Sequence, residues 1–253
     1  MAGHRAPTAA TQVTLVTGGG RGIGAAIAQR LAADGHDVVI AYRADRRAAE
    51  SVVGDLRAAG RRACAVPADV SSPEDVDRMF ETVQSELGAL TGLVNNAGLT
   101  AHLGRLADTP VDAIRRVVDV NLLGTILCAR AAARAMSTTG GASVNISSAA
   151  AALGSPGEYV HYAAAKAGVE ALTVGLAKEL AATGVRVNAV APGLVRTDIH
   201  AGAGDPGRPD RILDRVPLGR TGEPAEVAAA VAFLLGPEAE YVTGAVLKVA
   251  GGL

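Results

Sequence analysis

The sequence predicts a doubly wound α/β fold, a single parallel sheet of about seven strands (Rossmann type) flanked by helices on both faces. Short apolar, β-branched runs recur along the chain and leave room for a helix between successive runs. No repeat of 20 to 50 residues and no low-complexity linker divides the chain. The predicted strands are 13–17, 37–42, 63–67, 92–95, 142–147, 185–191 and 245–249. We therefore expect residues 13–253 to form one domain after a flexible tail, residues 1–12.

Three of the intervening helices are predicted to begin with the same short pattern. Ser72, Thr109 and Ser155 are each followed by a proline and, two residues after the proline, by Asp75, Asp112 or Glu158. A hydroxyl at the N-cap, proline at the first helical position and a carboxylate at the third all favour a helix start.

A further helix is expected to begin near Pro224, after an irregular stretch of glycine, proline and charged residues over 198–217. Loops of this length inside a compact domain are usually functional or disordered. We interpret 198–217 as a substrate loop, with a tolerated surface insertion as the alternative.

Composition limits the possible partners. The 24 Lys and Arg residues nearly balance the 25 Asp and Glu residues, so no field favours nucleic acid or an anionic membrane. The uncharged stretch 135–157 contains Ser, Thr, Asn, Gly and Pro, which excludes a membrane-spanning helix. The first dozen residues lack the apolar segment of a secretory signal, so we expect a cytoplasmic protein. Cys64 and Cys128 lack metal or disulfide spacing, so free thiols and no metal site are predicted.

A glycine-rich turn, TGGGRGIG over 17–24, follows the first predicted strand and precedes an alanine-rich helix. Glycines allow a sharp turn and a close backbone approach to a pyrophosphate, while a helix N-terminus offers unpaired N–H groups. The alternative is that the glycines serve only close packing of helix on strand. With a second strand at 37–42, the context favours a dinucleotide site.

The end of the second strand indicates which dinucleotide is bound. Folds that prefer NAD(H) usually place an acid there to bind the ribose hydroxyls, but this chain has Tyr42 and then Arg43. Because arginine can pair with a 2′-phosphate, NADP(H) is predicted over NAD(H). The alternative is that Arg43 caps a solvated helix end.

Tyr162 and Lys166 are four residues apart in a segment predicted to be helical, so they share one helix face. A neighbouring ammonium favours phenolate, and we expect it to bring the pKa of Tyr162 toward the range of an acid–base catalyst. The pair follows the strand at 142–147 and the adjacent Ser147 and Ser148.

Several ordered motifs then resemble those of the short-chain dehydrogenase/reductase family, in the subgroup that includes 3-oxoacyl thioester reductases. They are TGGGRGIG, NNAG at 95–98, Asn121, NISS at 145–148, YAAAK at 162–166, PG at 192–193 and YVTG at 241–244. The resemblance covers nearly the whole chain. It implies hydride transfer between a nicotinamide cofactor and a carbonyl or alcohol, in a homotetramer.

The resemblance also implies a catalytic tetrad. Tyr162 is expected to donate the proton, Lys166 also to bind the nicotinamide ribose, Ser148 to bind the substrate oxygen, and Asn121 to hold a water of the proton relay. Strand alternation lets only one of the two serines face the cleft readily, and the resemblance selects Ser148 over Ser147. His161 adjoins Tyr162, but its side chain points about 100° away around the helix, so no catalytic role is expected.

For the cofactor, the resemblance assigns Asp69 and Val70 to the adenine, Asn95 and Gly98 to the wall of the site, and Thr197 to the nicotinamide amide. The complete set of predicted cofactor residues is Gly18, Arg21, Gly22, Ile23, Gly24, Tyr42, Arg43, Asp69, Val70, Asn95, Ala97, Gly98, Tyr162, Lys166, Pro192, Gly193, Val195 and Thr197.

The substrate pocket is expected to be lined by Leu99, Thr100, residues 153–160, Leu194, Val195 and the loop 198–217, a mixture that selects no particular carbonyl. The loop between Ser148 and Tyr162 is one residue longer than in many members of the family, which could reshape this pocket. A ketone reductase is the favoured interpretation. An NAD-dependent alcohol dehydrogenase of the same family and a non-catalytic NADP(H)-sensing regulator remain alternatives.

Overall fold

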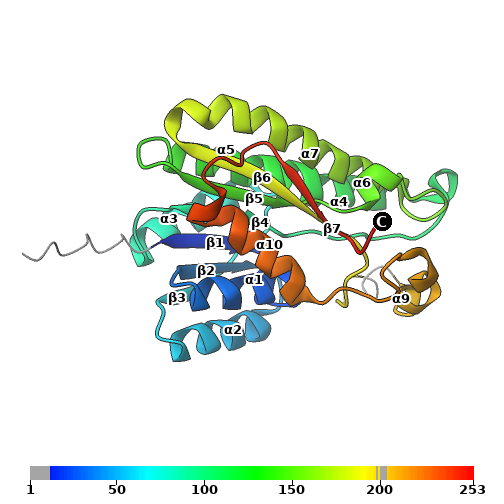
Figure 1. Ribbon diagram of the computed structural model, residues 1–253, viewed down its shortest axis with the longest axis horizontal. Coiled ribbons are helices and arrows are strands. Elements are labelled where there is room, and N and C mark those ends of the chain that lie inside the picture. Colours follow the sequence, from blue (N-terminus) through cyan, green and yellow to red (C-terminus); the bar gives the residue numbers. More distant parts are fainter. Residues whose placement is uncertain (1–11, 198, 200–203) are drawn as a thin grey trace, which may run out of the picture.

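Seven parallel strands form the centre of the computed structural model, which describes residues 12–197, 199 and 204–253 (Figure 1). Their order in the sheet is β3-β2-β1-β4-β5-β6-β7. The strands are β1 Val13–Thr17, β2 Asp37–Tyr42, β3 Ala63–Pro67, β4 Gly92–Asn95, β5 Gly141–Ile146, β6 Val185–Pro192 and β7 Val246–Val249. The order reverses between β1 and β4, and in open α/β sheets such a switch point leaves a crevice at the carboxyl ends of the strands.

The sequence predicts all seven strands, each to within one residue at either end. All five residues of β1 and the first five of β2 are buried. Strands covered on both faces show continuous rather than alternating apolar runs, which explains why the prediction succeeds.

Helices cover both faces of the sheet, as predicted (Figure 1). On one face α1 packs against α10 and α2, and on the other α3, α5, α7 and α4 pack together. The helices are α1 Gly22–Ala33, α2 Arg46–Ala58, α3 Pro73–Glu86, α4 Val111–Val118, α5 Gly124–Ala135, α6 Ala150–Leu153, α7 Val160–Leu180, α9 Arg208–Arg211 and α10 Pro224–Leu235. Two apolar clusters, one on each side of the sheet, consist mainly of Val, Leu, Ile and Ala.

Of the three predicted helix starts, only the first is confirmed in full. Ser72 caps α3, its hydroxyl accepting a hydrogen bond from the Asp75 N–H at 3.1 Å. The N-cap of α4 is Pro110 rather than Thr109, whose hydroxyl donates instead to the Arg105 carbonyl.

The helix start predicted at Ser155 is wrong, because α7 begins five residues later at Val160. Ser155 has φ 47° and Gly157 has φ 72°, and neither value is compatible with a right-handed helix. The Ser-Pro-Gly-Glu segment forms a turn in which the Glu158 and Tyr159 N–H groups donate to the Ser155 carbonyl.

The predicted tail over 1–12 lies outside the described residues except for Gln12. Of the predicted substrate loop 198–217, residues 198 and 200–203 also lie outside them. The remainder is less irregular than expected, since it contains α9 and a 3₁₀ turn at Leu213–Arg215. The helix predicted near Pro224 is confirmed as α10.

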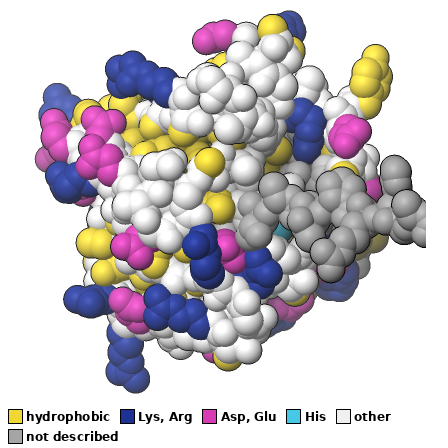
Figure 2. Space-filling view, turned by 90° about the vertical axis from the view of Figure 1, so that its left-hand side faces the viewer, with side chains coloured by type: hydrophobic (Ala, Val, Ile, Leu, Met, Phe, Trp, Pro, Cys, Tyr) yellow, Lys and Arg dark blue, Asp and Glu magenta, His cyan; other side chains and the backbone are white. Residues whose placement is uncertain are grey.

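Charges are mixed over the end of the molecule opposite α9, where Figure 2 shows basic and acidic side chains interspersed rather than separated into fields. Within the described part of the chain, each helix is too short or too polar to cross a membrane.

A buried carboxylate joins the start of β2 to the start of β3. Asp37 is 4% exposed and pairs with Arg61 at 2.8 Å and Arg62 at 2.9 Å. Burial alone would raise the pKa of Asp37, but hydrogen bonds from Arg62 and the charges of both arginines lower it below its usual value. The folded state therefore favours the ionised carboxylate.

We expect Asp37→Asn to lower the free energy of unfolding at pH 7 by about 2 kcal/mol, because it leaves the partly buried guanidinium of Arg61 and the more exposed one of Arg62 without their counter-charge. The folded pKa lies below the unfolded value of about 3.9, so the contribution is present above about pH 4 and is lost as the pH falls through the folded pKa. Urea unfolding at pH 7 and at stepwise lower pH measures both effects. Asp112→Asn is the control, since the Asp112 side chain is 95% exposed. Equal stability of the two variants at pH 7 would contradict the assignment.

Candidate active site

Two adjoining cavities lie over the carboxyl ends of the strands, and both have residues of the β1–α1 turn in their walls. Their volumes are about 330 and 400 Å³. We call the first the dinucleotide pocket and the second the substrate pocket. Their shared lining residues are Ile23, Asn96, Gly98, Thr197 and Ile199. The two cavities therefore form one continuous cleft, in which a ligand in the first can reach into the second.

The glycine-rich turn forms one wall of the dinucleotide pocket. Gly18 has φ 64° and Gly22 has φ 53°, conformations that other residues rarely adopt. A Cβ atom on Gly24 would lie 2.3 Å from the Gly18 carbonyl oxygen, so the turn can close only with glycine there. The N-terminus of α1 opens into this pocket behind Arg21, where a pyrophosphate would meet unpaired N–H groups.

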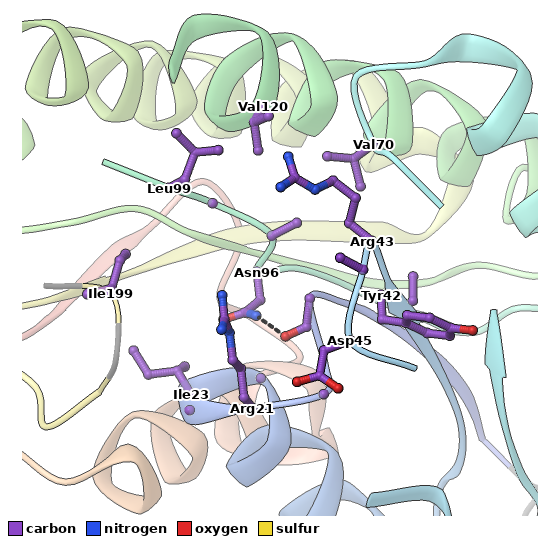
Figure 3. A pocket seen from close by; sticks show the side chains of 18 of the residues that line it. Arg21, Ile23, Tyr42, Arg43, Asp45, Val70, Asn96, Leu99, Val120 and Ile199 are labelled. Carbon is purple, nitrogen blue, oxygen red and sulfur yellow. Dashed lines mark hydrogen bonds between the residues drawn. The ribbon is translucent and has the colours of Figure 1, made fainter. Parts of the chain in front are cut away.

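Arg43 lies at the end of the dinucleotide pocket away from the glycine-rich turn. Arg43 extends from the end of β2 toward Val70 and Val120, and Arg21 rises from the turn (Figure 3). The Tyr42 ring points away from the labelled side chains of the pocket (Figure 3). Arg43 is therefore placed to meet a group at the far end of a bound dinucleotide.

Arg116 lines the same pocket and is absent from the sequence prediction. Its guanidinium donates to Asp69 at 3.0 Å, while the other Asp69 oxygen accepts from the Ser71 N–H and hydroxyl. Asp69 and Arg116 are 47 residues apart, so nothing local in the sequence signals the pair. It fixes the carboxylate that the resemblance assigns to the adenine.

The predicted cofactor residues line the two pockets with one exception. Asn95 is 4% exposed and lines neither pocket; its amide donates to Asn145 at 2.9 Å. Its place in the wall belongs to Asn96, whose amide donates to the carbonyls of Thr17 and Gly18 (the latter bond dashed in Figure 3). The expectation for Asn95 is thus corrected by one residue, because strand alternation turns Asn95 into the sheet interior.

Tyr162, Lys166 and Ser148 meet in the wall of the substrate pocket. Tyr162 and Lys166 lie one turn apart on α7, with the Lys166 Nζ 5.7 Å from the centre of the phenol ring. The Lys166 Nζ donates to the Ile146 carbonyl at 2.8 Å, and burial lowers its pKa to about 8. The ammonium thus has one hydrogen bond to the described protein and further donors for a ligand.

The pKa of Tyr162 departs from the expectation. Burial raises it above its ordinary value, and the hydrogen bond with Ser148 only partly offsets that rise. Lys166, whose Nζ donates to the Ile146 carbonyl, is not among the groups that lower the pKa of Tyr162. In the protein without ligand, Tyr162 is therefore a neutral phenol that can donate a proton.

Both serines line the substrate pocket, although only one is expected to face it, and they differ in their hydrogen bonds. Ser147 is 2% exposed, and its hydroxyl donates to the Glu170 carboxylate at 2.7 Å. The Ser148 oxygen accepts from the Ala150 N–H at 3.1 Å and lies against Tyr162. The Ser148 hydroxyl therefore lies beside the Tyr162 phenol, whereas the Ser147 hydroxyl is hydrogen-bonded to Glu170 of α7.

Asn121 is completely buried, within a π-helical turn at Asp119–Leu123, and lines neither pocket. Its amide donates to the carbonyls of Leu99 and Val117, and its side-chain oxygen accepts from the Leu99 N–H. A Cβ on Gly98 would lie 2.7 Å from that oxygen and 3.5 Å from the Lys166 Nζ. Asn121 thus holds the β4–α4 segment close to Lys166.

The rest of the substrate pocket comes from segments far apart in the chain. Thr100, Leu153, Leu194 and Val195 line it as predicted, whereas Leu99 lines the dinucleotide pocket. Leu253, at the end of the chain, also lines the substrate pocket and carries no sequence signal for that role.

Known proteins resemble the chain over nearly its full length. The family model described as Enoyl-(Acyl carrier protein) reductase matches residues 18–253. An oxidoreductase of Escherichia coli (strain K12), YgfF, described as uncharacterized, is 43% identical over 95% of this chain and 99% of its own length. A 3-oxoacyl-[acyl-carrier-protein] reductase of Synechocystis is 42% identical over 96% of both chains. The crystal structure of a short chain dehydrogenase from Burkholderia cenocepacia J2315 in complex with NADP is 40% identical, with a TM-score of 0.90 over 95% of this chain and 97% of that one.

The Gly24 contact gives a direct test of the dinucleotide pocket. Gly24→Ala should weaken binding of a reduced nicotinamide dinucleotide at least about tenfold, because the added methyl forces the turn away from α1 at a cost of about 1–3 kcal/mol. Fluorescence titration measures the binding. Gly54→Ala, on α2 with open space around its Cβ position, is the matched control and should raise stability by up to about 1 kcal/mol. Unchanged binding by Gly24→Ala would exclude the turn from the site.

Proposed function

The chain belongs to the short-chain dehydrogenase/reductase family, and we propose that it is an NADP(H)-dependent reductase that interconverts a ketone or aldehyde and its alcohol. The observation that carries the proposal is the meeting of Tyr162, Lys166 and Ser148 where the dinucleotide pocket opens into the substrate pocket. A neutral phenol, a hydroxyl and an ammonium at one point of a cleft suit proton transfer to a carbonyl oxygen.

The residues present fit a dinucleotide. A Cβ on Gly24 or Gly98 would collide with neighbouring protein atoms, so these glycines allow the tight backbone packing that forms the pocket wall and lets a ligand approach the backbone closely. NADPH, when bound, supplies the hydride. In the proposed assignment, the N-terminus of α1 and Arg21 hold the pyrophosphate, Asp69 and Val70 hold the adenine, and Thr197 holds the nicotinamide amide.

In the reduction, the Ser148 hydroxyl binds the carbonyl oxygen and the Tyr162 phenol donates its proton to that oxygen as negative charge develops on it. Lys166 binds the nicotinamide ribose through the Nζ donors that the protein leaves unused. Asn121 positions Gly98 and the β4–α4 segment and is proposed to hold a water through which the phenolate regains a proton.

Arg43 supports NADP(H) over NAD(H). A 2′-phosphate carries about two negative charges, and a guanidinium can bind it through two parallel hydrogen bonds. The last residue of β2 is Tyr42 rather than an acid, and the carboxylate of Asp45, which also lines the pocket, caps α2. The Burkholderia relative is described in complex with NADP, which agrees with this assignment.

Two alternatives have distinct signatures. An NAD-linked alcohol dehydrogenase would show higher kcat/KM with NAD⁺ and an alcohol than with NADPH and a carbonyl. A non-catalytic NADP(H)-sensing regulator would bind the dinucleotide and turn over nothing, and the complete set of Tyr162, Lys166 and Ser148 argues against it. The names of the matched family and relatives include both enoyl and 3-oxoacyl substrates, so a substrate panel needs both.

We also propose that residues 13–253 work as one catalytic domain within a cytoplasmic homotetramer. Exposed apolar side chains lie in two groups. The first is Val111, Leu123, Ile126 and Val174, on α4, the π-helical turn, α5 and α7, and the second is Phe233 and Leu247, on α10 and β7. Two self-complementary faces are what a tetramer with two kinds of two-fold contact needs. The free thiols of Cys64 and Cys128 suit a reducing compartment.

The reaction is tested by following NADPH oxidation with ketones, diketones, 3-oxoacyl and enoyl thioesters. Tyr162→Phe should lower kcat on the best carbonyl by at least about 10²-fold, because it removes the transferable proton and keeps the ring. NADPH affinity should change little. Tyr241→Phe, at a fully exposed tyrosine, is the control and should behave as wild type. Wild-type kcat in Tyr162→Phe would refute the mechanism, and dinucleotide binding with no turnover of any compound would favour the regulator.

Cofactor preference is tested at Arg43. Wild type should have higher kcat/KM with NADPH than with NADH, and Arg43→Ala should lower the NADPH value about tenfold while leaving the NADH value nearly unchanged. Arg47→Ala, which removes an arginine of α2 that does not line the pocket, is the control. A wild-type preference for NADH would contradict the NADP(H) assignment, and an unchanged ratio in Arg43→Ala would remove Arg43 from it.

A further inference from the structure

Glu158 joins three segments around the substrate pocket. Its backbone carbonyl accepts a hydrogen bond from the Gly104 N–H, on the β4–α4 segment, at 2.7 Å. Its carboxylate accepts two from Arg208 of α9, from Nε at 3.2 Å and from Nη2 at 2.5 Å. The side chains of Glu158 and Arg208 are only 16% and 8% exposed. This is a nearly buried ion pair between segments 50 residues apart.

The turn before Glu158 contains three residues with positive φ, a conformation that is unfavourable for the one that is not glycine. Gly154, Ser155 and Gly157 all have positive φ, at 70°, 47° and 72°. The two glycines are used for conformation rather than for space, since a Cβ on either would meet nothing within 4 Å. A serine in the left-handed region costs free energy and persists where surrounding contacts determine the backbone. Next to Ser155, the Glu158 contacts with Gly104 and Arg208 are contacts of this kind.

The pair also reaches the catalytic phenol. The Arg208 guanidinium carbon lies 4.9 Å from the centre of the Tyr159 ring. Tyr159 in turn meets Tyr162 edge to face, with ring centres 5.3 Å apart and planes at 87°. Arg208, Tyr159 and Tyr162 form a continuous line of contacts along the wall of the substrate pocket.

We propose that Glu158 and Arg208 are positioning residues for the reaction: their ion pair holds α9 closed over the substrate pocket and fixes Tyr159 against Tyr162. This rests on the proposed carbonyl reduction. The carboxylate of Glu158 balances the guanidinium charge, so the pair shapes the pocket rather than attracting an anionic substrate. Arg211 and Arg215 approach the same carboxylate only to 3.9 and 4.0 Å and are more than half exposed, so they lie outside the central pair.

A buried ion pair responds differently to the loss of one partner and to the loss of both. Removing one partner leaves the other charge buried and unpaired, whereas replacing both with neutral groups of similar size is tolerated. Glu158→Gln and Arg208→Gln alone should each reduce the population with α9 closed, and the double variant should recover much of it. Arg211→Gln, the same change on a more exposed arginine three residues along, is the matched control.

In kinetics, each single variant should raise KM for the carbonyl about tenfold, because apparent affinity falls with the fraction of protein in the binding-competent state. The dissociation constant for NADPH should stay within about twofold of wild type, since neither residue lines the dinucleotide pocket. The double variant should return KM toward the wild-type value. Recovery separates positioning from direct binding, because a residue that bound substrate itself would leave the double variant as impaired as the worse single variant.

A second measurement does not depend on turnover. Trypsin can cut after Arg211 and Arg215 when α9 opens, and Arg208 is followed by proline, so its substitution removes no efficient site. Mass spectrometry should show faster cleavage at 211 and 215 in both single variants and a near wild-type rate in the double variant. In the Arg211→Gln control, cleavage is followed at 215 alone and should match wild type. If no carbonyl is reduced, this measurement alone decides the proposal. Single variants that match wild type in cleavage, or a double variant that recovers neither KM nor cleavage rate, would overturn it.

Discussion

The reversal of strand order between β1 and β4 determines where every functional side chain of this protein lies. Chain crossovers leave this point in opposite directions, so the carboxyl ends of the two strands are open to a ligand. Thr17 ties together the ends of β1 and β4 on the two sides of this opening: its hydroxyl oxygen accepts from the N–H groups of Asn96 and Ala97 at 3.0 Å. The Asn96 amide returns two hydrogen bonds to the carbonyls of Thr17 and Gly18. The glycine turn and the β4–α4 segment are thereby held together on either side of the dinucleotide pocket.

Burial then sets the chemistry of the groups around that opening. Lys166 is 3% exposed and has the Ile146 carbonyl as its hydrogen-bond acceptor, so its ammonium is incompletely solvated and its pKa falls to about 8. Tyr162 is buried beside it and stays neutral. Both groups are held at a cost in solvation that a ribose and a carbonyl oxygen would reduce. An unligated site of this kind is preorganised for charge that develops only during reaction.

The sequence predicts the strands, the glycine turn and the Tyr162–Lys166 pair because each depends on local pattern: buried β-branched runs, backbone freedom and four-residue helical spacing. Its errors share a different cause. Ser155 has the signature of a helix cap, but it lies in a turn whose Glu158 contacts Gly104 and Arg208, residues distant in the sequence. Asn95 and Asn96 are indistinguishable in a motif, and only strand pairing with Asn145 turns the first away from the pocket. The pKa of Tyr162 depends on burial, which no spacing reveals.

The two halves of the cleft accordingly differ in how far sequence determines them. The dinucleotide half is built on the ends of β1, β2 and β4, so short motifs specify it. Proteins named for different substrates, enoyl and 3-oxoacyl, can therefore share it. The substrate half is assembled from the β4–α4 segment, the turn before α7, α9 and the chain terminus, which meet through contacts such as Arg208 with Glu158. Such contacts depend on loop lengths and on single residues far apart in the chain. The substrate pocket is therefore the part of the structure that local pattern specifies least, and the contact between α9 and Glu158 is one of the long-range contacts that shape it.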